Sequence, residues 1–334
     1  MIYLVFLLKK NHISCAKKYI ELYYLEPLGK KNILLFTILA YTAFLGINSL
    51  ILSLSGVPRH ELLINEQAAG IDYLLLSGFF KVMFSISWFF SKALFLKIIS
   101  MFGLLFVIMI TASRSELAFV IFYMITLLMI AFNMQSFKKI IFIPVILTLT
   151  AILATVFLQN RAELNIDIFS TMLETVMKYR VYPYYLSEES MAVSGQFEKY
   201  LYPFFGYFSE YPMQKMFSLD NPVNTEFVIK FHVIGESLNS GLPYLANVLY
   251  PWWSWFVGSY GVLGLVLKAV YSFLILFFLI SKRLYLTSIY FFMVLLFGES
   301  GTHPFMLVSN IFTIIMFMIF DLYAKNNYRR FYKA

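Results

Sequence analysis

The sequence predicts an all-α, polytopic transmembrane helical protein with about eight spans and one large extracytoplasmic loop. The chain of 334 residues is 60% hydrophobic and only 13% charged, whereas soluble domains carry roughly 25% charged residues. Its mean hydropathy is +0.76. Apolar stretches of about 20 residues recur along the chain, and each is long enough to cross a hydrocarbon core of about 30 Å.

We predict a single integral-membrane domain over residues 1–334, with a large external loop over residues 159–258. Each span is placed on a continuous apolar stretch, because only a helix satisfies its own backbone hydrogen bonds inside lipid. The predicted spans are Asn32–Leu54, Ile71–Phe90, Ala93–Ala112, Leu117–Met134, Ile140–Leu158, Ser259–Ile280, Ser281–Phe297 and Phe305–Tyr323.

The distribution of Lys and Arg predicts that both termini are cytoplasmic. Fifteen of these residues then lie in the cytoplasmic segments and eight on the opposite face, and seven of those eight are in or near long loops. Charge in long loops has little influence on topology, so the positive-inside rule favours this orientation. The net charge of +8 is therefore explained by the ends of spans, and we predict no nucleic-acid partner.

Lys81 lies in the middle of the predicted span Ile71–Phe90. A charge inside the membrane is costly enough to indicate a functional site. Two plainer interpretations stand beside it: the lysine extends its ammonium group to the interface, or the predicted boundary of the span is misplaced.

The external loop is unusually long for a connection between spans, which indicates function or structure of its own. It begins with an amphipathic helix predicted over Asp167–Lys178, and eight tyrosines follow between residues 179 and 211, Tyr182 and Tyr184 among them. Aromatic faces suit sugar rings. They are also typical of the aromatic belt at a membrane surface, and the two interpretations are compatible.

Later in the loop, Glu226, His232 and Glu236 are side chains able to transfer protons or bind hydroxyl groups. The four histidines are scattered without the spacing of a metal site, so we predict neither a metal nor a cofactor. The sequence contains no Gly-rich nucleotide loop and no cytoplasmic segment large enough for a nucleotide domain. An energy-rich donor would therefore reach the outer face attached to a lipid.

The segment Thr111-Ala-Ser-Arg-Ser-Glu-Leu117 places Arg114 at the outer tip of a predicted helical hairpin. Three interpretations are open. Arg114 anchors the hairpin at the interface, or it pairs with Glu116 to lower the cost of its own burial. Alternatively it binds an anionic headgroup, because guanidinium makes forked, charge-assisted hydrogen bonds with phosphate.

Thr111-x-Ser113-Arg114-small-x-Leu117 resembles a T-x-S-R-G-x-L segment of the bacterial O-antigen polymerase and ligase superfamily, with Ser115 where glycine is usual. Tyr260-Gly261-Val-Leu-Gly264 resembles the Y-G-x-x-G turn that opens the span after the large loop in that superfamily. The layout is similar from about Leu94 to the C-terminus.

Departures from the superfamily's patterns help to separate its two activities. The Arg-x10-Gly pattern of some polymerase loops is absent after Arg161 and Arg180. A ligase would have a His-rich element late in the loop, where only His232 stands. The resemblance therefore favours a polymerase.

The resemblance implies a metal-independent glycosyltransferase of the bacterial cytoplasmic (inner) membrane. Such an enzyme joins undecaprenyl-diphosphate-linked oligosaccharide repeat units into O-antigen or capsular polysaccharide on the outer face. Its partners would be this lipid-linked oligosaccharide and membrane lipid, with a chain-length regulator protein as a further candidate. The alternatives are an O-antigen ligase and a flippase or other transporter of lipid-linked oligosaccharide.

Members of the superfamily usually have more than eight spans. At the start of this chain, Ile2–Leu8 is followed by Lys9 and Lys10. This pattern is typical of the cytoplasmic end of a span or of a short interfacial anchor, and both interpretations are open.

Transfer from a lipid diphosphate requires cations for the leaving group and a base for the acceptor hydroxyl. His232 is the favoured base because free imidazole titrates near pH 6.5. The predicted catalytic residues are Arg114, Arg180, His232 and Glu236, and the predicted substrate-binding residues are Arg161, Glu226, Tyr182, Tyr184 and His303, the last in an outer turn.

Overall fold

The computed structural model describes residues 32–55, 71–91, 93–111, 115–131, 181, 184, 187–188, 191, 200–209, 215–216, 232–236, 243–246, 251–297, 303–305 and 308–333. The chain divides into two compact units. The bundle unit comprises Ile2–Leu164, Phe277–Phe292 and Phe312–Ala334, and the loop unit comprises Asn165–Leu276 and Met293–Ile311.

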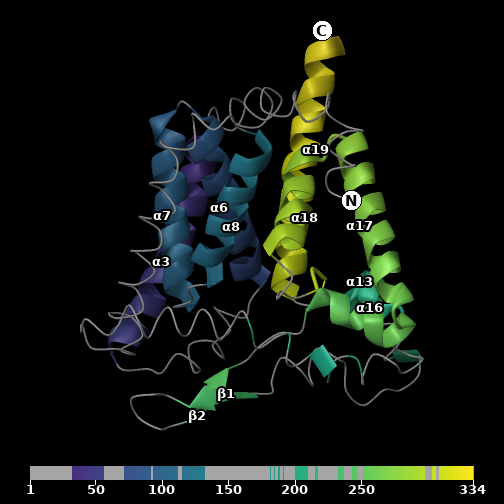
Figure 1. Cartoon of the computed structure of the whole chain (residues 1–334). Coiled ribbons are helices and arrows are strands. Elements are labelled where there is room, and N and C mark those ends of the chain that lie inside the picture. Colours follow the sequence, from purple (N-terminus) through teal and green to yellow (C-terminus); the bar gives the residue numbers. More distant parts are fainter. Residues whose placement is uncertain are drawn as a thin grey trace. The chain divides into compact units, whose positions relative to one another are not determined.

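The bundle unit is built from helices that run side by side (Figure 1). Two of them, α3 (Asn32–Leu54) and α6 (Ile71–Phe90), coincide with predicted spans. The next two, α7 (Leu94–Thr111) and α8 (Ser115–Ala131), begin and end within three residues of the predicted bounds. The predicted span Ile140–Leu158 and the predicted helix Asp167–Lys178 lie outside the described residues.

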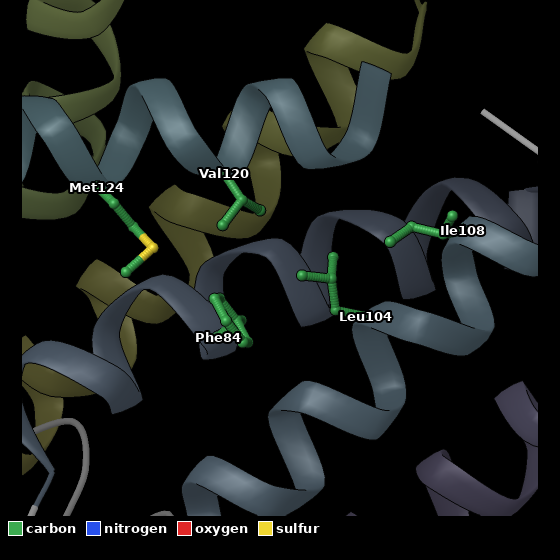
Figure 2. Packing of buried hydrophobic residues seen from close by; sticks show 5 residues of the cluster. All are labelled: Phe84, Leu104, Ile108, Val120 and Met124. Carbon is green, nitrogen blue, oxygen red and sulfur yellow. The ribbon is translucent and has the colours of Figure 1, made fainter. Parts of the chain in front are cut away.

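A cluster of apolar side chains from α6, α7 and α8 forms part of the core of the bundle. Val120 and Met124 of α8 point toward Phe84 of α6 and toward Leu104 and Ile108 of α7, and all five side chains are buried (Figure 2). Burying each of these side chains contributes about 1.5–3 kcal/mol where the alternative is water. Because the connection between α7 and α8 is only three residues long, this packing fixes them as a hairpin.

The last two helices differ from the predicted spans at their starts. Residues Lys282 and Arg283 form a turn in which Arg283 has a φ of 61°, so α18 (Tyr285–Phe297) begins four residues later than the predicted span. Helix α19 (Val308–Lys333) begins three residues later than predicted and continues ten residues beyond the predicted end of the span at Tyr323. Many of its later residues are polar, so hydropathy alone does not reveal this continuation.

A carboxylate from α19 caps the start of α18. The side chain of Asp321 is fully buried and accepts hydrogen bonds from the backbone N–H of Leu286 at 3.1 Å and of Thr287 at 2.9 Å. The hydroxyl of Thr287 also donates to Asp321, at 2.7 Å. The first N–H groups of a helix lack partners within the helix and carry a partial positive charge. A carboxylate therefore accepts hydrogen bonds from these N–H groups and also stabilises the start of α18 through its negative charge.

Tyr123 of α8 contacts the same end of α18. Its hydroxyl donates a hydrogen bond to the carbonyl of Leu286 at 3.1 Å. Its ring stacks on Phe317 of α19, with ring centroids 4.8 Å apart. These contacts join α8, α18 and α19 within the bundle unit.

Lys81 lies at the middle of α6 and is only 6% exposed. Helix α6 has the predicted bounds Ile71–Phe90, so Lys81 lies within a helix, and its depth in a membrane stays a prediction. Its Nζ lies 5.0 Å from the ring centroid of Phe119 in α8. An ammonium group at this distance is attracted by the negative face of the ring. The functional interpretation of Lys81 stays a prediction.

The loop unit contains a small sheet that the sequence did not predict. Strand β1 (His232–Glu236) pairs antiparallel with β2 (Pro243–Ala246), in the register His232 with Ala246 and Val233 with Leu245. The register shifts before Glu236 pairs with Pro243. The described residues are thus mostly helical, as predicted, with this two-stranded sheet in addition.

The predicted span Ser259–Ile280 is corrected at its start. Two helices cover this region, α16 (Trp252–Tyr260) and α17 (Leu263–Ser281), and a turn at Gly261 and Val262 separates them. Gly261 has a φ of +61°, which a residue with a side chain adopts with strain. Both helices are apolar, so hydropathy alone does not show where one ends.

Three helices in the described part of the chain are long and apolar enough to cross a membrane, over Asn32–Leu52, Ile71–Trp88 and Leu263–Ser281. Only 28% of the first and the third is buried within the protein, against 67% of the second. Apolar side chains that the protein leaves exposed along a whole helix suit contact with lipid. These helices support a membrane protein, and the count of eight spans stays a prediction.

Candidate functional site

Arg114 belongs to the connection between α7 and α8. Helix α7 ends at Thr111 and α8 begins at Ser115, so the arginine falls between two apolar helices, while Glu116 lies in the first turn of α8. Arg114 itself lies outside the described residues, as do four other predicted site residues: Arg161, Arg180, Tyr182 and Glu226.

His232 and Glu236 are the first and last residues of β1. Four residue steps separate them, which corresponds to about 13 Å along an extended strand. The structure therefore brings both residues onto one element but leaves their backbones well apart.

Tyr184, predicted to bind substrate, is 43% exposed. Its ring lies 6.3 Å from that of Trp253 in α16, measured between the ring centroids. A pair of neighbouring aromatic rings with one of them exposed is compatible with sugar stacking, and the role of Tyr184 stays a prediction.

The loop unit contains an aromatic cluster around His303. It joins α13 (Tyr202–Phe205), the start of α16 and residues 303–305, three segments that are distant in the sequence. The ring of His303 lies 5.3 Å from that of Tyr202 and 5.5 Å from that of Trp252. The indole N–H of Trp252 donates to the carbonyl of Pro203 at 2.9 Å.

Both ring nitrogens of His303 are engaged. Nδ1 accepts a hydrogen bond from the backbone N–H of Phe305 at 3.0 Å, and Nε2 lies 2.9 Å from the carbonyl of Pro203. Because Nδ1 accepts, the proton lies on Nε2, which donates to that carbonyl. Burial lowers the pKa of His303 from 6.5 to about 3, although hydrogen bonds to the backbone of Pro203 and Tyr202 favour the protonated form. The histidine is thus neutral at physiological pH.

This geometry gives His303 a packing role, because its ring holds α13 against α16. The role of His303 in substrate binding stays a prediction, and it requires one of these hydrogen bonds to open. The sequence indicates only the turn around the histidine. Its partner Pro203 is 100 residues away, and no local signal identifies such a contact.

The junction of α16 and α17 is fixed by the close approach of two backbones. A Cβ atom on Gly264 would lie 2.1 Å from the carbonyl oxygen of Phe256, so only glycine fits. The hydroxyl of Tyr260 donates to the carbonyl of Tyr200 at 2.6 Å. The Tyr260-Gly261-x-x-Gly264 segment therefore forms the predicted turn.

Lys268 in α17 is a candidate functional residue that the sequence analysis missed. Its Nζ lies 5.5 Å from the ring of Trp252. The available signal was a lysine within a predicted span, as at Lys81. In the part of the chain that the structure describes, no group of three or more His, Cys, Asp or Glu side chains has the arrangement of a metal site.

No protein-family model, no characterised protein and no solved structure matches this chain.

Proposed function

We propose that this chain is an integral-membrane glycosyltransferase that polymerises lipid-linked oligosaccharide repeat units. The observation that carries the proposal is the Thr111–Leu117 segment, with an arginine in a short connection between two apolar helices. The ends of α7 and α8 at Thr111 and Ser115 support this interpretation of the segment. The turn geometry at Gly261 and Gly264 supports the second element of the resemblance.

The reaction requires the protein mainly to position the donor and the acceptor and to stabilise the charge that develops on the leaving group. The bond between the anomeric carbon of the donor sugar and the diphosphate oxygen breaks, and an acceptor hydroxyl oxygen forms the new bond to that carbon. The hydroxyl loses its proton to a base, for which His232 is the favoured residue and Glu236 the next. Negative charge develops on the departing diphosphate, and Arg114, with Arg180 and Arg161, would stabilise it by preorganised charge.

The experiment that tests this function compares surface glycan from a strain that lacks the gene with glycan from its parent on a ladder gel. Loss of a polymerase leaves a single repeat unit on the surface carrier. Loss of a ligase or of a flippase leaves none. A normal ladder in the deletion strain would contradict the proposed function, and complementation with the full-length chain controls for secondary mutations.

A further inference from the structure

Helix α17 carries a single charged side chain among 19 residues, Lys268. It follows the start of the helix by five residues, which corresponds to about 7.5 Å along the helix axis. A helical side chain leans toward the N-terminus of its helix, and the lysine stem is long. Its ammonium group therefore reaches the end of α17 at which the aromatic cluster around His303 lies.

Lys268 lies on the side of α17 that faces the protein. Tyr271 and Ser272, three and four residues further on, share this face, and Ser272 is only 3% exposed. On the other faces, Val266 and Val270 are 59% and 50% exposed. The lysine thus lies between the aromatic ring of Trp252 and an exposed apolar surface of α17 that is suited to lipid.

The aromatic side chains near Lys268 are held in place by hydrogen bonds. Trp252, whose ring the ammonium group approaches, is anchored through its indole N–H to Pro203. Tyr271 is anchored through its hydroxyl, which donates to the carbonyl of Phe204 at 2.6 Å. Because Trp252 and Tyr271 are anchored in this way, the surface that the ammonium group approaches is ordered.

Ser272 supplies a second and independent observation. Its Oγ is buried and has no hydrogen-bond partner among the residues that the structure describes. Several other buried or partly buried serines donate to a carbonyl three or four residues earlier, as Ser288 does to Tyr285 and Ser85 to Lys81, both at 2.7 Å. An unsatisfied buried hydroxyl is destabilising unless a partner is supplied, so this donor is available to a ligand, one helical turn from the backbone of Lys268.

We propose that Lys268 and Ser272 form a binding site for the phosphate group of a lipid. The ammonium group would neutralise the charge of the phosphate and donate to its oxygens, and the serine hydroxyl would donate to one oxygen. Entry of that oxygen requires a shift of the flexible Lys268 stem, which lies one turn away on the same face. The exposed apolar residues of α17 favour a lipid over free phosphate, because the acyl or prenyl tail packs on them.

This site does not depend on the proposed function, because binding a lipid phosphate requires no transfer reaction. If the chain is a polymerase, the ligand would be the phosphate of a polyprenyl carrier, and that extension rests on the proposed function.

The test uses the purified full-length protein in nanodiscs of phosphatidylcholine, with undecaprenyl phosphate as the probe and retention measured by native mass spectrometry. We expect Lys268→Met to weaken binding about tenfold and Ser272→Ala about threefold, while Lys268→Arg retains most of the affinity. Lys282→Met is the matched control. Lys282 follows the same helix and its Nζ lies 5.8 Å from the ring of Phe278, but the side chain is exposed.

Normal binding by a folded Lys268→Met variant would overturn the proposal, as would an equal loss in Lys282→Met. Thermal unfolding of each variant shows whether the protein still folds. Binding of the probe by Lys268→Arg shows whether a positive charge at this position is sufficient. Phosphatidylglycerol that competes as well as the probe would support a site for lipid phosphates in general. Inorganic phosphate that competes at the same concentration would overturn the lipid assignment. A wild-type protein that binds the probe but leaves the glycan ladder of the deletion strain uncomplemented would refute the proposed function and leave this site standing.

Discussion

The carboxylate of Asp321 in α19 accepts hydrogen bonds from both the backbone N–H and the hydroxyl of Thr287 in α18, at 2.9 and 2.7 Å. Through this contact a carboxylate of α19 provides the acceptor for N–H groups at the start of α18, although Thr287 and Asp321 are 34 residues apart in the sequence. It makes α18 and α19 depend on each other for their stability.

Asp321→Ala should lower the free energy of unfolding by about 2–3 kcal/mol, because it leaves buried N–H groups at the start of α18 without an acceptor. Denaturant unfolding of the purified protein in detergent measures the loss. Asp72→Ala is the control, since Asp72 accepts a hydrogen bond from Tyr41 at an exposed site, and it should have a much smaller effect. Equal losses in the two variants would contradict the capping role.

Gly264→Ala should be more damaging than Gly261→Ala. At Gly264 the new Cβ would lie 2.1 Å from a backbone oxygen, whereas at Gly261 nothing lies within 4 Å. We expect a loss of about 3 kcal/mol for Gly264→Ala, because backbone has to move. Gly261→Ala should lose about 2 kcal/mol, because a φ of 61° with a ψ of −149° is a backbone conformation that is essentially restricted to glycine. Melting temperatures in the reverse order would show that the junction of α16 and α17 is packed differently.

Acid should loosen the aromatic cluster around His303. Burial lowers the pKa of His303 to about 3 in the folded protein, against 6.5 when it is exposed. Below pH 6.5 the unfolded form therefore binds a proton that the folded form does not, and stability falls progressively down to about pH 3. Between pH 7 and pH 5 the free energy of local opening should fall by about 2 kcal/mol. Hydrogen exchange of the backbone amides in α13 and α16 measures it.

His303→Gln should remove this dependence on pH, since an amide keeps a donor but does not titrate in this range. His60→Gln, which alters a histidine elsewhere in the chain, should leave it intact. An unchanged pH dependence in His303→Gln would assign the effect to another group.

Under the proposed function, Arg114→Ala should abolish long-chain glycan and leave a single repeat unit on the surface, because the leaving diphosphate would lose the guanidinium group at the connection between α7 and α8. Arg114→Lys should also fail if the forked geometry is required, whereas activity with lysine would mean that charge alone is sufficient. Ladder gels of complemented deletion strains measure the chain length, with membrane abundance checked by immunoblot. Arg59→Ala is the control arginine, and ordinary chain lengths in Arg114→Ala would remove Arg114 from the mechanism.

The sequence predicted the helices best where an apolar stretch is bounded by polar residues, as in α3 and α6. It failed where two apolar helices meet, because hydropathy is the same on both sides of the turn at Gly261. It also missed β1, a strand of five residues, because a segment this short with a glycine in it has no clear alternation of apolar and polar residues.

The candidate site was likewise predictable from the sequence only in part. The arginine at position 114 and the turn around His303 were visible locally. The partners of His303 and the surroundings of Lys268 are set by tertiary contacts with α13 and α16, which local patterns do not encode. Asp321 and Lys268, like Lys81, are charged residues inside predicted spans, and such a charge is a local signal of a structural or functional role.

The most direct test of lipid-linked polymerisation is an assay of the purified full-length protein in liposomes that contain undecaprenyl-diphosphate-linked repeat units. We predict that the wild-type protein lengthens these saccharides while they remain on the lipid and that Arg114→Ala does not. Liposomes in which the folded wild-type protein leaves every saccharide at one repeat unit would contradict the proposed function.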